Sequence, residues 1–142
     1  MKHIFTLCTF FVLIGCNKKQ EQIKDTIEQE RPIIKRKELL KNFSYEDIAK
    51  YTISTVMGQS PKIMSVNEQN DLYIVSYIRK SDKQKFTYKV KFESDTAIWA
   101  NIDGRWRDSS EDETIKFEEI GEKLKIKTFY SDGSSEIEEF SK

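Results

Sequence analysis

The sequence predicts an α+β domain in which one N-terminal helix packs on an antiparallel sheet of about six or seven short strands. Three observations support this prediction. Between residues 44 and 57, apolar side chains recur at helical spacing. From residue 63 onward, short runs of β-branched and aromatic residues alternate with polar ones. Turn signals separate these runs, most clearly Asp103-Gly104 and Asp132-Gly133.

The helix is predicted over residues 44–57. Ser44 suits the N-cap position, and Asp47 follows at the spacing that completes a capping box. Gly58 is a natural C-terminal stop, and Pro61 lies just beyond it. We expect the apolar side of this helix to cover one face of the sheet.

The strands are predicted in the rest of the chain. Residues 85–93 have the clearest alternation, with Phe86 and Tyr88 on one face and Lys85 and Lys89 on the other. The chain is expected to reverse at Asp103-Gly104 and return through a short strand. The predicted strands are residues 63–66, 72–79, 85–93, 96–102, 114–120, 124–130 and 134–140, with residues 105–107 as the short return of the hairpin.

This order of one helix followed by hairpin-linked strands is similar to that of cystatin-like and NTF2-like small domains, with a small β-barrel as the alternative. Neither likeness fixes a function.

The start of the chain resembles a bacterial lipoprotein signal peptide. Lys2 precedes an apolar run over residues 4–14 that is too short to span a membrane. The run closes on Leu13-Ile14-Gly15-Cys16, which is similar to a lipobox. The resemblance implies cleavage between Gly15 and Cys16, and fatty acyl chains such as palmitate on Cys16.

We therefore expect three parts: a signal peptide over residues 1–15, the lipidated cysteine with a flexible tether over 16–42, and a single globular domain over 43–142. Asn17 follows the lipobox in place of an aspartate that would resemble an inner-membrane retention signal. The resemblance thus favours the periplasmic face of the outer membrane, where the lipid anchor makes the membrane itself a partner.

Cleavage would remove His3, the only histidine, together with Cys8, and lipidation would use Cys16. The mature chain then lacks the groups for a histidine triad, a cysteine nucleophile or a His/Cys zinc site. We expect no metal, no cofactor apart from the lipid on Cys16, and no enzyme activity. Because 24 basic residues balance 24 acidic ones, we also expect no nucleic-acid partner.

The charged rows of the predicted strands are interpreted as cross-strand ion pairs on a solvated sheet face. The basic rows are Lys85, Lys89 and Lys91, and Lys123, Lys125 and Lys127; the acidic rows are Glu111, Asp112 and Glu113, and Glu136, Glu138 and Glu139.

The candidate binding site is Arg105-Trp106-Arg107, because tryptophan and arginine dominate protein interfaces. In that interpretation Trp106 is an exposed anchor between two carboxylate-binding guanidinium groups. The alternative is that Trp106 packs in the core, opposite Trp99 or Tyr77, while both arginines face water.

The sequence favours a non-catalytic envelope lipoprotein that binds another envelope protein, for exclusion or inhibition. A small-ligand binder is the first alternative, with an apolar pocket between helix and sheet lined by Tyr73, Tyr77, Phe86, Tyr88 and Phe92. A carboxylate-dependent glycan hydrolase is the second and less favoured alternative.

Overall fold

The computed structural model describes residues 40–142. The predicted signal peptide, the cleavage and lipidation residues Gly15 and Cys16, and the tether up to residue 39 lie outside the described residues. Within residues 40–142, no helix is both long enough and apolar enough to cross a membrane.

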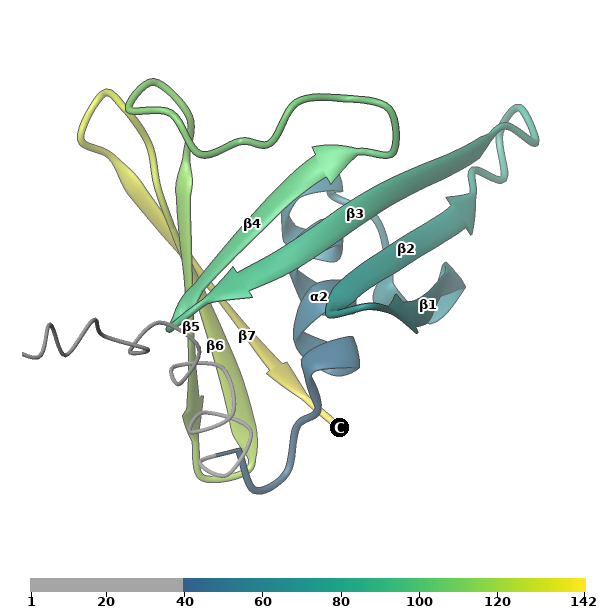
Figure 1. Ribbon diagram of the computed structural model, residues 1–142. Coiled ribbons are helices and arrows are strands. Elements are labelled where there is room, and N and C mark those ends of the chain that lie inside the picture. The colour runs from purple at the N-terminus through teal and green to yellow at the C-terminus, as the bar shows by residue number, and fades with distance from the viewer. Residues whose placement is uncertain (1–39) are drawn as a thin grey trace, which may run out of the picture.

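One helix packs on a seven-stranded antiparallel sheet, which confirms the α+β prediction (Figure 1). The elements are α2 (Tyr45–Met57), the short 3₁₀ helix η1 (Pro61–Ile63), β1 (Met64–Gln69), β2 (Leu72–Ile78), β3 (Lys85–Glu93), β4 (Thr96–Asn101), β5 (Thr114–Ile120), β6 (Lys123–Phe129) and β7 (Ser135–Ser141).

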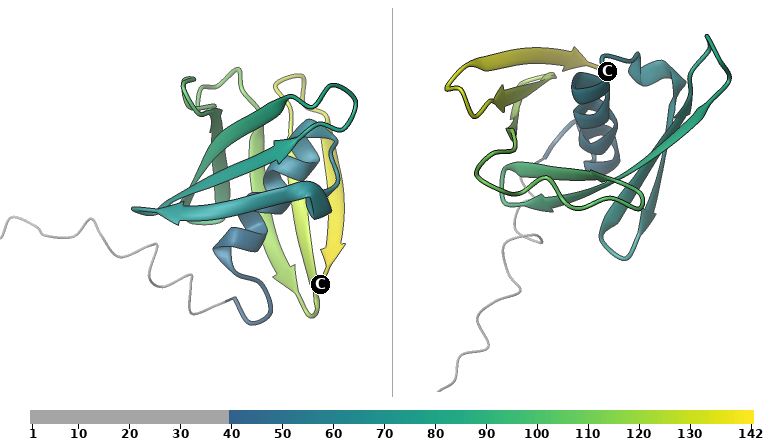
Figure 2. Two further views of the ribbon diagram at one scale, coloured as in Figure 1. Left: turned by 90° about the vertical axis from the view of Figure 1, so that its right-hand side faces the viewer. Right: turned by 90° about the horizontal axis from the view of Figure 1, so that it is seen from above.

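The strands follow one another across the sheet in chain order, so the sheet is an open meander with β1 and β7 at its edges. It curves around α2, which occupies the concave side (Figure 2). β4 and β5 pair only through Thr96–Lys116 and Ala97–Ile115, whereas β3 and β4 pair over six positions. Beyond those two pairs, β4 and β5 diverge.

The ends of α2 are fixed by the residues predicted to fix them. The Ser44 hydroxyl accepts a hydrogen bond from the Asp47 amide at 3.2 Å, and the Asp47 carboxylate accepts one from the Ser44 amide at 2.9 Å. Together these two bonds form the capping box. Gly58 ends the helix in the left-handed conformation, at φ 59°, where a side chain would be strained.

The hydrophobic core lies between α2 and the concave face of the sheet. On the helix, Ile48 and Ile53 are fully buried. They belong to the same core as the equally buried Val75 of β2 and Ile126 of β6. These two strands lie in opposite halves of the sheet, which are β1–β4 and β5–β7. The helix therefore contributes to one core that both halves of the sheet share.

The turns between strands differ in their backbone conformation. Asn70 and Asp71 adopt φ of 50° and 61°, as a tight hairpin turn between β1 and β2 requires. Asp103 and Gly104 do not have positive φ, although Gly104 does donate a turn hydrogen bond to Asn101. Because the backbone twist of a two-residue hairpin is missing, residues 105–107 do not return as a strand, and that prediction is wrong.

The buried hydroxyl of Thr128 indicates a substitution that should stabilise the fold. Its hydroxyl is buried without a hydrogen-bond partner among the described residues, whereas the hydroxyl of the buried Thr52 donates to the Ile48 carbonyl at 2.8 Å. Replacing Thr128 with valine removes an unsatisfied polar group at constant shape. We expect Thr128→Val to raise the free energy of unfolding by about 1 kcal/mol, measured by urea denaturation.

Thr52→Val is the matched control, because it removes a satisfied hydroxyl, and no gain is expected there. An equal gain in both variants, or a loss for Thr128→Val, would contradict this explanation.

Candidate functional site: the β4–β5 loop

The longest connection between strands is the β4–β5 loop, residues 102–113. It crosses the end of the sheet where β4 and β5 have separated (Figure 1). Loops of about this length without regular secondary structure are uncommon in small domains and are often functional. This loop contains all three candidate binding residues, Arg105, Trp106 and Arg107.

A buried carboxylate holds the loop together. The Asp112 residue is only 8% exposed. Arg105 donates to it with both terminal nitrogens, at 2.7 and 2.8 Å, in a bidentate arrangement. Ser109 donates to the same carboxylate through its amide at 3.1 Å and its hydroxyl at 2.6 Å. The hydrogen bonds from Arg105, followed by those from Ser109, lower the pKa of Asp112 well below its ordinary value.

Arg107 joins the loop to β4. Its amide donates to the Trp99 carbonyl at 3.0 Å, and its guanidinium lies 5.0 Å from the centre of the Trp99 ring. The Trp99 indole in turn donates to Glu113 at 2.7 Å. An Arg107 nitrogen lies 3.5 Å from Asp112, so both candidate arginines approach the same carboxylate.

Trp106 lies on the outer, convex face of the sheet. The ammonium groups of Lys89 and Lys91 on β3 are 5.0 and 5.1 Å from its ring centre. Those lysines pair with Ala100 and Ile98 of β4, which are buried although they point away from the main core. Trp106 is itself half-buried. The expectation that it packs in the core, opposite Trp99 or Tyr77, is therefore wrong.

Trp106 and the two flanking arginines contact different groups. The tryptophan lies on the outer face, and the arginines bind Asp112 of the same loop in place of a partner's carboxylates. Asp112, the residue at the centre of this network, was not predicted from the sequence as a site residue. Ser109 and Asp112 repeat the spacing of the helix-capping pair Ser44 and Asp47, and that spacing was the available signal.

The aromatic residues expected to line a ligand pocket between helix and sheet pack against one another. Tyr77 stacks on Phe86 and on Tyr88, with ring centres 5.3 and 6.2 Å apart. Tyr73 contacts Phe92 edge-on at 5.3 Å. Tyr73 also lines a surface pocket at the start of α2.

The charged rows of β6 and β7 do form cross-strand pairs. The Lys123 ammonium is 2.9 Å from the Glu139 carboxylate, and that of Lys125 is 3.9 Å from it. The row at residues 111–113 differs, because Asp112 and Glu113 belong to the loop network described above. In residues 40–142, no three acidic, histidine or cysteine side chains are grouped so that they could hold a metal ion.

Comparison with known proteins assigns no family: no family model matches the chain, and no curated protein or solved structure is significantly similar to it.

The lowered pKa of Asp112 predicts how stability depends on pH. A carboxyl group whose pKa is lower in the folded state stabilises the fold above its unfolded pKa, ordinarily 3.8, and loses that contribution as the pH falls toward the folded value. We expect Asp112→Asn to lower the urea midpoint at pH 6. The difference from the parent should shrink as the pH is lowered from 4 to 2.

Glu111→Asn is the matched control, because Glu111 is an exposed neighbour. A difference between Asp112→Asn and the parent that stays constant over this pH range would show that the Asp112 charge does not stabilise the loop.

Proposed function

We propose that this chain is a membrane-anchored envelope lipoprotein whose domain is a non-catalytic protein-binding module of the exclusion or inhibitor type. Lipidation at Cys16 would hold it at the membrane, with the periplasmic face of the outer membrane as the proposed location. The β4–β5 loop would contact a protein partner. The order of one helix and a meandering sheet supports the likeness to cystatin-like or NTF2-like domains as part of this proposal.

The observation that carries the proposal is that Trp106 is partly exposed on a loop that is already ordered. Asp112 holds Arg105 and Ser109, and Arg107 hydrogen-bonds β4, so the segment on both sides of the tryptophan is fixed. A partner would then bind without having to order the loop, which lowers the entropic cost of association.

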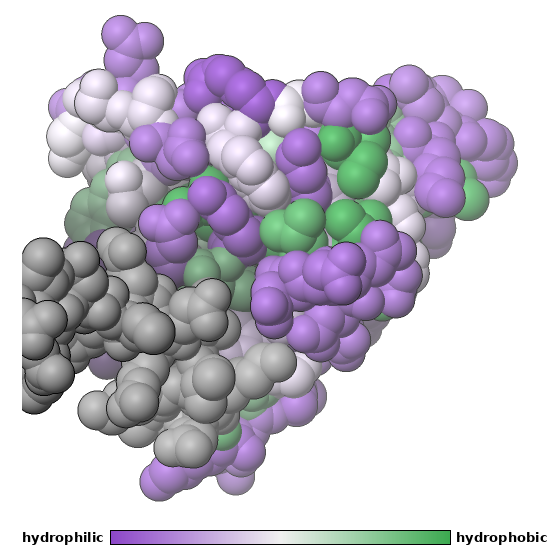
Figure 3. Space-filling model, viewed as in Figure 1, coloured by the Kyte–Doolittle hydropathy of each residue, from purple (hydrophilic) through white to green (hydrophobic). Residues whose placement is uncertain are grey.

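The surroundings of Trp106 resemble a binding hot spot more than a sealed core. The Arg105 side chain is 65% exposed although its guanidinium is paired, and Lys89 and Lys91 border the ring. An aromatic anchor with a charged, solvated rim is the usual anatomy of an interface centre. On the face shown in Figure 3, apolar side chains form only small groups among hydrophilic ones.

A tethered module of this kind works at high effective concentration. If the lipid holds the domain beside an envelope protein, a small interface around Trp106 can be sufficient for occupancy. The two sites would thus act together, with Cys16 supplying proximity and the loop supplying specificity.

Crosslinking in intact envelopes tests the proposed interface. The full lipoprotein carrying an affinity tag is crosslinked, recovered and compared with a Trp106→Ala variant by mass spectrometry. We expect a specific envelope protein in the parent sample and a loss of at least about tenfold in the variant, because truncating a hot-spot tryptophan costs about 2 kcal/mol or more.

Phe129→Ala is the matched control, since Phe129 is also partly exposed and also has a lysine, Lys127, 4.5 Å from its ring centre. Recovery lost equally in both variants, or unchanged in Trp106→Ala, would contradict the proposal.

A Cys16→Ser variant tests the anchor: we expect it to leave the membrane fraction, and retention as firm as the parent's would refute lipidation.

A further inference from the structure

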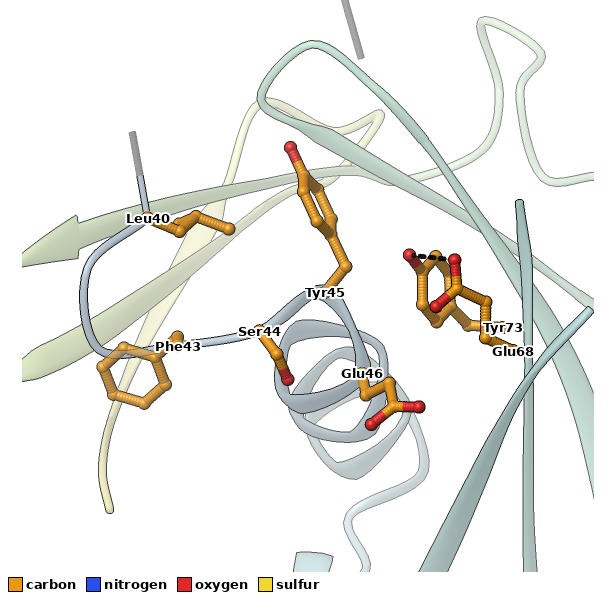
Figure 4. Close-up of a pocket in the computed structure, with 7 residues that line it drawn as sticks. All are labelled: Leu40, Phe43, Ser44, Tyr45, Glu46, Glu68 and Tyr73. Carbon is orange, nitrogen blue, oxygen red and sulfur yellow. Dashed lines mark hydrogen bonds between the residues drawn. The ribbon is translucent and has the colours of Figure 1, made fainter. Parts of the chain in front are cut away.

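A pocket of about 480 Å³ lies where the described chain begins, between the start of α2 and strands β1 and β2 (Figure 4). It is separate from the β4–β5 loop and shares no residue with it. The lining residues are Leu40, Phe43, Ser44, Tyr45, Glu46, Glu68 and Tyr73.

The chemistry of this pocket combines aromatic walls with negative charge. The rings of Phe43, Tyr45 and Tyr73 are almost fully buried and give it an apolar surface. Glu46 and Glu68 are both exposed, and the Tyr73 hydroxyl donates to Glu68 at 3.2 Å, which holds that carboxylate at the wall. None of the lining residues is basic. The pocket therefore suits a segment that is both apolar and cationic.

We propose that the occupant is the chain's own tether, residues 33–39, which reads Ile-Ile-Lys-Arg-Lys-Glu-Leu. The two isoleucines match the aromatic walls. The three consecutive cations, Lys35, Arg36 and Lys37, match the two carboxylates.

The position of the segment supports this assignment as strongly as its chemistry. Leu40 is both a wall of the pocket and the residue that directly follows the segment. The next two residues are fixed, because the amides of Lys41 and Asn42 donate to the Glu119 carboxylate at 2.9 to 3.2 Å. At about 3.4 Å per residue, Lys37 lies within about 10 Å of Leu40 and Ile34 within about 20 Å.

Docking would set how far the domain can move from the membrane. A free tether of about 25 residues has a root-mean-square reach of about 27 Å, and the part that remains free after docking, residues 17–32, has a reach of about 22 Å. When the tether is fully extended, docking shortens its reach by more, about 30 Å. The docked form would hold the domain close to the lipid, and release would extend it toward a more distant partner.

Limited proteolysis of the full lipoprotein in detergent micelles tests the proposal. Trypsin cuts after Lys35, Arg36 and Lys37, and also after Lys18 and Lys19, which lie outside the proposed docked segment. In the parent we expect cleavage at residues 35–37 to be at least about tenfold slower than at residues 18 and 19, because cleavage requires undocking.

The double variant Glu46→Gln/Glu68→Gln should remove this difference, and so should 0.5 M salt. Asp103→Asn/Glu111→Gln removes the same charge from exposed residues of the β4–β5 loop and should leave the protection intact. A second variant, Ile33→Ser/Ile34→Ser, changes no residue of the pocket and should also abolish protection.

Equal cleavage of both groups of sites in the parent, or protection that survives in Glu46→Gln/Glu68→Gln and in Ile33→Ser/Ile34→Ser, would overturn the proposal. Unprotected sites in the parent would leave the pocket to an external cation or a partner's basic segment. Because the test uses no partner protein, its result is independent of the crosslinking experiment on Trp106.

Discussion

The burial of α2 in the concave side of the sheet is the interaction on which the other features depend. The sheet has two halves, β1–β4 and β5–β7, and strands β4 and β5 pair at only two positions, beside one further backbone hydrogen bond from the Phe117 amide to the Asp95 carbonyl. The backbone hydrogen bonds between β4 and β5 would by themselves join the two halves only weakly. Ile48 and Ile53 of the helix are fully buried in a core that both halves share, so burial of apolar surface supplies the connection that strand pairing does not. The capping box and Gly58 set the length of the helix to fit this space.

The divergence of β4 and β5 also creates the candidate binding loop. A short turn cannot join two strands that have separated, so residues 102–113 cross the gap and need stabilising contacts of their own. Asp112 provides them, as a carboxylate that accepts hydrogen bonds from Arg105 and Ser109. Trp106 is then positioned over β3 on the outer face. The proposed interface is in this sense a consequence of how the helix and sheet pack.

The features that could be predicted from the sequence are those that depend on neighbouring residues. The helix and its caps depend on residues at most a few positions apart, and the alternation of residues 85–93 reports burial directly, so both were predicted correctly. The failure at Asp103-Gly104 has a different origin. Whether that dipeptide makes a hairpin depends on where β5 lies and on the contact of Arg105 with Asp112, and neither is encoded in the dipeptide. The side of the sheet chosen by Trp106 follows from the same long-range contacts.

Native-state hydrogen exchange tests the central claim, that α2 joins both halves of the sheet and the β4–β5 loop into one cooperative unit. The informative amides are those of β3, those of β6, and the amide of Arg107, which donates to the Trp99 carbonyl. We expect all three groups to exchange through the same global unfolding, with equal free energies of opening. Exchange of the two sheet halves at distinct free energies, or an Arg107 amide that exchanges as fast as an open chain, would contradict the account.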